Sequence, residues 1–212
     1  RNQAEVKAFF AYEKPDIVKK YEDKVLFKYD LKQFRLDKYS KEINLIRSNY
    51  DEKERVIQAI ILNQYRQELA TKQNINLKPV ILFKAKQTIK ESEKNKQNFH
   101  QLIESLDENS INSIRETSTV TIVQKALSFF DSNHLSSNEL AKRLKSNFRP
   151  ENCLSANDDK EAEANQIKLN TLEDANNPIR AIFAVQKLNE GWDVLNLFDI
   201  VRLYEGQNSG GS

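Results

Sequence analysis

The stretch Pro79-Val-Ile-Leu-Phe83 decides the fold class of this chain. It is a short, wholly apolar run with proline at its entrance, which is typical of a central strand in a parallel sheet covered on both faces. Further strand candidates lie at Cys153–Ala156, Ile179–Val185 and Asp199–Tyr204. Helical patterns separate these runs, and strands that alternate with helices predict an α/β fold with a parallel sheet.

The helices are predicted from capping residues and from apolar side chains at helical spacing. Three pairs of residues have the spacing of a capping box: Asp51 with Glu54, Thr88 with Glu91, and Ser136 with Glu139. After Asp51 the apolar residues fall on one helical face as far as about Ala70. We predict further helices from Thr88 to Leu106, over residues 115–131 and over residues 136–148.

The region before Asp51 has a different pattern. Apolar side chains that alternate with polar ones predict a half-buried strand; they are Val25, Phe27, Tyr29 and Leu31. Later apolar residues predict strands that pair with it in antiparallel fashion; they are Phe34, Leu36 and residues 43–46. We therefore expect three parts. They are a linker of antiparallel β-structure and helix over residues 1–75, a second domain over 76–205 with a helical insertion at 115–148, and a flexible tail at 206–212.

Glycine is scarce, and its positions exclude two classes of nucleotide site. The chain has four glycines, Gly191, Gly206, Gly210 and Gly211, in 212 residues. Neither a Walker A loop nor a G-x-G-x-x-G turn is present, because both need glycine where the backbone wraps around phosphate. The chain also begins at Arg1 and has no methionine, so we expect a segment of a longer protein.

Charge is unevenly distributed along the chain. The formal net charge is +2, but residues 1–100 carry 22 basic and 14 acidic side chains, whereas residues 101–212 carry 11 and 17. A basic half can attract the phosphate backbone of a nucleic acid. A solvated surface explains most such imbalances, so charge alone leaves both interpretations open.

Other features argue against a membrane or metal protein. The longest apolar runs have five residues, whereas a membrane span needs about 20. A single cysteine, Cys153, cannot form an internal disulfide, which favours a reducing cytoplasm; we interpret it as a small buried hydrophobe. His100 and His134 are isolated, so we predict no metal site.

Ligands of open parallel sheets bind at the carboxyl ends of the strands. Lys84 and Lys86 follow one predicted strand, and Asn189-Glu-Gly-Trp-Asp193 follows another. Gly191 permits the backbone to approach a ligand closely. The alternative is a glycine turn in which Trp192 anchors the core and Asp193 caps the next element, and spacing alone favours this alternative.

Two longer stretches resemble a known family. Asn177–Val185 and Leu188–Tyr204, which contains the run Glu190-Gly-Trp-Asp-Val194, closely resemble the helicase motif V region of the restriction (Res) subunit of type III restriction–modification enzymes. Pro79–Lys86 is similar to the motif IV strand of that family, and Lys24–Lys41 and Gln166–Asp174 also resemble the subunit. The resemblance implies the second RecA-like domain of a superfamily 2 DNA motor, preceded by a linker region.

The resemblance also implies residue roles. Gly191 and Asp193 match the motif V glycine and aspartate, which line the ATP cleft facing the first RecA-like domain. Lys84 and Lys86 stand where such motors touch the DNA backbone, although two solvated lysines are an equal alternative. ATP and Mg²⁺ would be bound mainly by the first RecA-like domain, upstream of Arg1, and the implied partners are double-stranded DNA and the methyltransferase (Mod) subunit.

The sequence therefore predicts part of an ATP-dependent DNA translocase and restriction endonuclease subunit, located in the cytoplasm. No catalytic residue or nuclease constellation is expected in this stretch, so it should be inactive by itself. Two alternatives stay open: a non-catalytic α/β module that binds protein or DNA, and a superfamily 2 repair or remodelling helicase domain.

Overall fold

The computed structural model describes residues 14–21, 24, 31–39, 46, 51–156, 162–185 and 194–203. The chain divides into two units, Arg1–Ile46 and Arg47–Ser212. The first unit contains two short helices among its described residues, α2 (Pro15–Tyr21) and α3 (Leu31–Leu36). The predicted strand residues Val25, Phe27 and Tyr29, and residues 43–45, lie outside the described ranges.

The prediction of β-structure at Leu31, Phe34 and Leu36 is wrong, because all three residues lie in α3. A short apolar run often fits helical and strand periods equally well, and here Leu31 and Phe34 have helical spacing. Local contacts support the helical turn: the backbone N–H of Asp37 donates to the carbonyl of Gln33, and the rings of Phe34 and Tyr39 lie 5.5 Å apart.

The second unit contains the predicted parallel sheet. Its strands are β1 (Val80–Lys84), β2 (Cys153–Ser155), β3 (Ala181–Ala184) and β4 (Leu197–Arg202). They are all parallel and follow the order β2-β3-β1-β4, so β1 and β3 are central. The apolar run that begins at Pro79 therefore forms a central strand, as its composition predicts, and the fold is an α/β fold of the RecA-like type.

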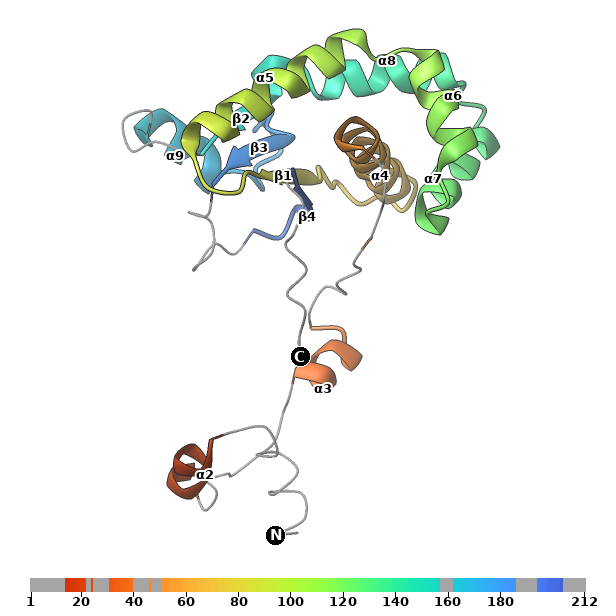
Figure 1. Cartoon of the computed structure of the whole chain (residues 1–212). Helices are drawn as coiled ribbons and strands as arrows, with labels where there is room; N and C mark the ends of the chain where they lie inside the picture. The colour runs from red at the N-terminus through yellow and green to blue at the C-terminus, as the bar shows by residue number, and fades with distance from the viewer. Residues whose placement is uncertain are drawn as a thin grey trace. The chain divides into compact units, whose positions relative to one another are not determined.

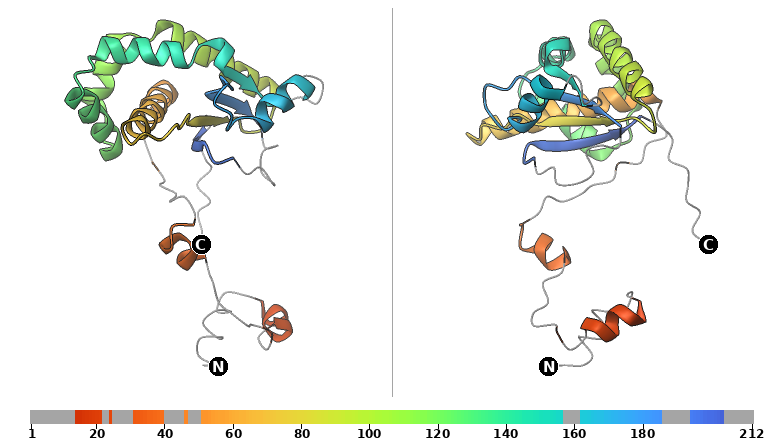
Figure 2. Two further views of the ribbon diagram at one scale, coloured as in Figure 1. Left: turned by 180° about the vertical axis from the view of Figure 1, so that it is seen from behind. Right: turned by 90° about the vertical axis from the view of Figure 1, so that its left-hand side faces the viewer.

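Helices cover both faces of this sheet (Figures 1 and 2). The described helices of this unit are α4 (Glu52–Lys72), α5 (Ile89–Ser105), α6 (Glu108–Thr117), α7 (Thr121–Ser132), α8 (Ser137–Asn147) and α9 (Ala162–Asn170), with a 3-10 turn at Pro150–Asn152. Ile81 and Phe83 of β1 pack in the larger core with α4 to α8, and Val80 and Leu82 pack on the other face with Leu169 of α9. Helices α5 to α8 form an arc around α4 in Figure 1.

Helix α4 is buried on all sides over its central turns. Every residue from Val56 to Tyr65 is buried, including Asn63 and Gln64, whereas the sequence predicts a helix with one apolar face. Tyr65 makes edge-on contacts with Phe129 and Phe130 of α7, at ring distances of 5.1 and 6.4 Å. The sequence-based boundary near residue 75 would separate α4 from the sheet, but in the structure α4 packs within the second unit.

The predicted helix starts agree well with the structure. Asp51, Thr88 and Ser136 are N-caps whose side chains accept the backbone N–H three residues later. The predicted single helix over 115–131 is wrong, because Ser118 and Val120 have extended backbone and separate α6 from α7. Helix α6 has its own capping box at Asp107 and Ser110, in which serine takes the place of the Glu or Gln that usually marks this motif in a sequence.

The burial of α4 predicts that its apolar residues stabilise the sheet domain. Ile60 is fully buried, so Ile60→Ala should lower the free energy of unfolding by about 2–5 kcal/mol, as for other buried Ile-to-Ala changes. The matched control is Ile75→Ala, because Ile75 is 57% exposed. Urea unfolding of the chain measures both changes, and equal effects of the two substitutions would contradict the central position of α4.

Candidate functional site

The carboxyl edge of the sheet carries basic side chains from neighbouring strands. Lys84 is the last residue of β1 and is half-buried, and its partner in the register of β4 is Arg202, which is exposed. Paired residues on parallel strands point to the same face of the sheet. The structure therefore places Arg202 beside Lys84, which adds a cation to this edge that the sequence alone does not place there.

Lys86 lies in the turn between β1 and α5, and its side chain is exposed. The Glu91 carboxylate accepts the backbone N–H groups of Lys86 and Gln87, at 3.4 and 3.3 Å. The Thr88 side chain accepts the N–H of Glu91 at 3.2 Å and so caps α5. These contacts fix the turn backbone and present Lys86 to solvent at the same edge as Lys84.

A further lysine lies at the end of β2. Lys96 of α5 donates through Nζ to Oγ of Ser155, the last residue of β2, at 3.0 Å. Lys96 lies about two turns into α5 in a largely polar stretch, so the sequence alone gave no reason to single it out. The carboxyl edge is thus basic at β1, at β4 and beside β2.

The two predicted cleft residues, Gly191 and Asp193, lie outside the described residues. The structure describes the chain up to Val185, directly after β3, and again from Val194, shortly before β4. Residues 186–193 therefore connect two strands that are separated in the sheet by β1. Their assignment to an ATP cleft remains a prediction.

A buried arginine lies near the amino ends of the strands. Arg180 precedes β3 and is only 3% exposed. Its guanidinium donates to Pro79 O at 3.1 Å, to Gln67 Oε1 at 2.7 Å and to Asn63 Oδ1 at 2.7 Å, and it lies 5.2 Å from the centre of the Phe148 ring. Burial lowers the pKa of Arg180 to about 10, so the side chain is still charged at neutral pH.

Asn63 connects Arg180 to an ion pair on β4. The Asn63 amide donates to Asp199 Oδ2 at 3.5 Å, and Nη1 of Arg66 lies 2.7 Å from both Asp199 oxygens. Burial raises the pKa of Asp199, and the Arg66 guanidinium and the Asn63 amide oppose that rise. This polar cluster of Asn63, Arg66, Arg180 and Asp199 attaches α4 to two strands.

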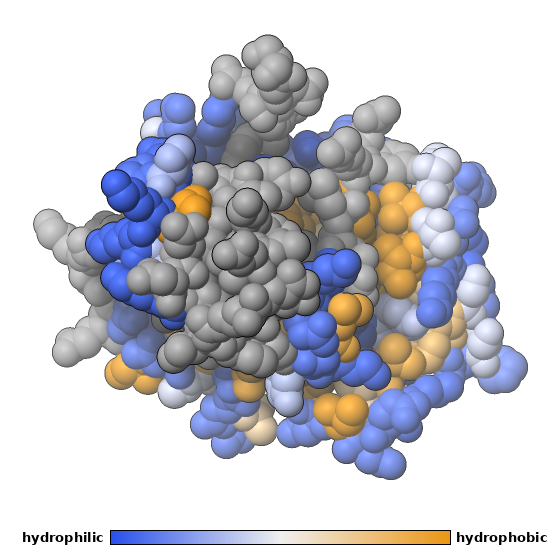
Figure 3. Space-filling model, turned by 90° about the horizontal axis from the view of Figure 1, so that it is seen from below, coloured by the Kyte–Doolittle hydropathy of each residue, from blue (hydrophilic) through white to orange (hydrophobic). Residues whose placement is uncertain are grey.

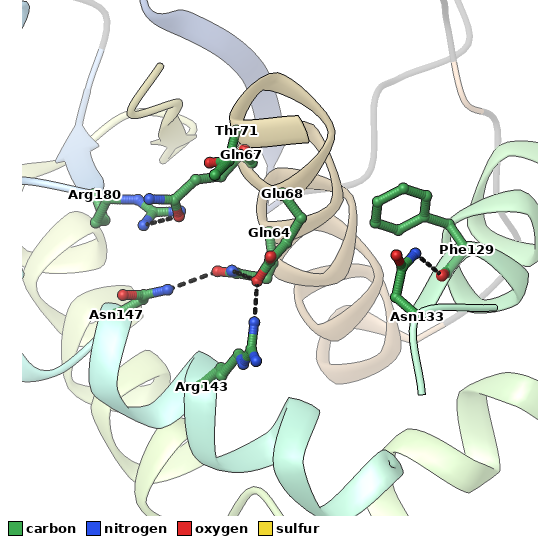
Figure 4. Close-up of polar contacts among 9 residues, drawn as sticks. All are labelled: Gln64, Gln67, Glu68, Thr71, Phe129, Asn133, Arg143, Asn147 and Arg180. Carbon is green, nitrogen blue, oxygen red and sulfur yellow. Dashed lines mark hydrogen bonds and ion pairs between the residues drawn. The ribbon is translucent and has the colours of Figure 1, made fainter. Parts of the chain in front are cut away.

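A small cavity of about 260 Å³ lies between α4 and α8. Its lining is polar and consists of Gln64, Gln67, Glu68, Thr71, Arg143, Ser146 and Asn147. Asn147 donates to Gln64 at 2.6 Å, and Arg143 pairs with Glu68 at 2.6 Å (Figure 4). These four side chains already pair with one another, so the cavity by itself indicates no ligand.

The comparisons with known proteins identify the family. A curated protein of Haemophilus influenzae, "Probable type III restriction-modification enzyme HindVIP Res subunit", is 40% identical over an alignment that covers 94% of this chain. The chain belongs to the Res-subunit family of type III restriction–modification enzymes. The predicted resemblance to this family is thus confirmed. No family model and no solved structure matches.

The chain spans less than half the length of this Res-subunit relative, because the alignment covers 43% of that protein.

Among the described residues, no group of three or more His, Cys, Asp and Glu side chains is arranged to hold a metal ion. None of the helices in the described ranges combines the length and apolar character needed to cross a bilayer. On the face in Figure 3, hydrophobic residues lie in separate groups among hydrophilic ones.

Cys153 has no features of a reactive thiol. It is buried in β2, and its Sγ lies 3.6 and 3.5 Å from the carbonyl oxygens of Phe148 and Arg149. Burial raises the pKa of this thiol from 9.0 to about 12. The structure therefore agrees with the interpretation of Cys153 as a small core residue.

We predict that Cys153 resists alkylation in the folded chain. The thiolate is the nucleophile, and a rise in pKa from 9.0 to about 12 makes it roughly a thousandfold scarcer at pH 8. Iodoacetamide should label the native chain far more slowly than the chain in urea, as measured by mass spectrometry. Equal labelling rates in the two states would contradict the buried position.

Proposed function

We propose that this chain supplies the second RecA-like domain of the ATP-driven DNA motor in a type III restriction enzyme. Family membership carries the proposal, because a Res-subunit relative aligns with nearly the whole chain. The parallel sheet fits such a domain, and the connection between β3 and β4 contains the run Glu190–Val194 that resembles helicase motif V.

In this proposal the nucleotide is shared with a first RecA-like domain. That domain binds most of the ATP and Mg²⁺, since this sequence has no phosphate-binding glycine loop. Gly191 allows the backbone to come close to the nucleotide, and Asp193 accepts a hydrogen bond from the ribose or holds an arginine of a later motif. Closure of the two domains on ATP changes their grip on DNA and so drives movement along it.

The proposed nucleic-acid partner is double-stranded DNA, which the domain binds through its phosphates. Lys84 and Lys86 supply cations at the carboxyl edge, where open α/β sheets bind ligands. Phosphate contacts position a protein on DNA without reading its sequence. Recognition of the DNA site is accordingly assigned to a methyltransferase (Mod) subunit, and the complex works in the cytoplasm.

The first test concerns Asp193. In the intact restriction subunit, Asp193→Ala should remove most DNA-stimulated ATPase activity and leave static DNA binding largely intact, because the side chain serves the nucleotide cleft. The control is Asp174→Ala, which removes an exposed carboxylate beyond the amino ends of the strands. Unchanged turnover in Asp193→Ala, or ATPase activity from the 212 residues alone, would refute the assignment.

The second test concerns the two lysines. Lys84→Ala and Lys86→Ala should each weaken DNA binding for all sequences alike, and each lost phosphate contact should reduce the slope of log affinity against log salt by about 0.9. Fluorescence anisotropy with duplex DNA over a salt series measures both effects. Lys125→Ala, at an exposed position of α7, is the matched control. A slope that stays the same in both lysine variants would mean that these side chains are only solvated.

A further inference from the structure

Asn63 forms hydrogen bonds with charged groups on two different segments of the sheet. Its side chain is fully buried in α4. The Oδ1 atom accepts from Arg180, directly before β3, at 2.7 Å, and the Nδ2 group donates to Asp199 of β4 at 3.5 Å. The positive and negative partners together allow only one orientation of the amide.

The two strands that Asn63 joins are the strands on either side of the proposed motif V connection. Residues 186–193 lie between β3 and β4 in the chain, but β1 separates these strands in the sheet. The pairing of β1 with β4 is irregular between Val80 and Ile81, and Asp199 is the partner of Ile81 directly after the irregularity. Backbone pairing with β1 alone therefore leaves β4 less firmly fixed than a regular ladder would, and Asp199 provides a side-chain attachment at that point.

The chemistry of this polar cluster suits the positioning of β3 and β4 better than the stabilisation of the fold. Arg180 donates to three neutral oxygens, and the described contacts give its guanidinium no carboxylate partner. A buried charge of this kind costs desolvation energy, and well-packed apolar residues are often as stabilising as a buried ionic group. Directional contacts from one helix to two strands do, however, fix how those strands lie relative to each other.

We propose that Asn63 is a positioning residue: by binding Arg180 and Asp199 together, it sets the relative placement of β3 and β4 and so of the connection that carries Gly191 and Asp193. The effect on turnover rests on the proposed motor function. The effect on the strands does not, because it follows from the described contacts alone.

Swapping the amide of Asn63 and the carboxylate of Asp199 tests this proposal. Asn63→Asp places a carboxylate against Asp199, so in the intact enzyme the kcat of DNA-stimulated ATP hydrolysis should fall about tenfold, within the range of coupling between contacting residues, with the KM for ATP unchanged. The double variant Asn63→Asp with Asp199→Asn restores one carboxylate and one amide in exchanged positions. It should recover kcat to within about threefold of the original.

Two controls separate positioning from a loss of folding. Asn147→Asp in α8 alters another amide contact of α4, the part-buried bond to Gln64, without touching either strand, and kcat should stay within about twofold. Thermal unfolding of each variant identifies a loss of folded protein. If Asn63→Asp does not fold, the double variant is compared with Asp199→Asn alone, and recovery of kcat is still the expected result.

Hydrogen exchange on the 212-residue chain tests the same idea without ATPase activity. Peptides from 181–203 should exchange faster in Asn63→Asp and recover in the double variant, while peptides from α7 stay unchanged. Unaltered exchange over 181–203, or a double variant no better than the single ones, overturns the positioning role. If the intact enzyme with the original sequence has no DNA-stimulated ATPase activity, the proposed function is wrong. The hydrogen-exchange result alone then decides whether Asn63 positions the strands.

Discussion

The burial of the central turns of α4 on every side is the constraint on which the second unit depends. A helix in this position has no solvent-facing side for its polar residues, so Asn63 and Gln64 need partners inside the protein. Arg180 before β3 and Asn147 of α8 supply those partners. The requirement to satisfy these groups holds the helix in one position and links the sheet to the helical arc.

Much of the fold was predictable because it depends on local signals. The apolar run at Pro79 and the caps at Asp51 and Ser136 each act within a few residues, and the structure confirms them. The errors arise where distant packing decides. Leu31 and Phe34 fit helical and strand periods alike, and the all-round burial of α4 depends on helices more than 40 residues further along the chain.

The candidate site was predictable only in part, for a related reason. Lys84 and Lys86 were predictable because they follow the apolar run that begins at Pro79 directly in the sequence. Arg202 becomes their neighbour only through the register of β4, and Lys96 joins the edge through its contact with Ser155. Arg180 is a charged residue within the otherwise apolar run Ile179–Val185, so a buried polar contact could be expected there. The sequence does not show, however, which residues Arg180 would contact.

The two ends of the sheet have different physical characters, and this difference fits the two proposed roles, binding at one end and positioning at the other. At the carboxyl edge Lys86 and Arg202 are exposed, so they can exchange water for phosphate with little rearrangement. Towards the amino ends Arg180 is buried and donates to three protein oxygens, which fits the proposed role of its cluster in placing the strands. In the proposed motor, the exposed cations serve the grip on DNA and the buried cluster serves the alignment of the nucleotide cleft, so substitutions at the two ends of the sheet should alter these two properties separately.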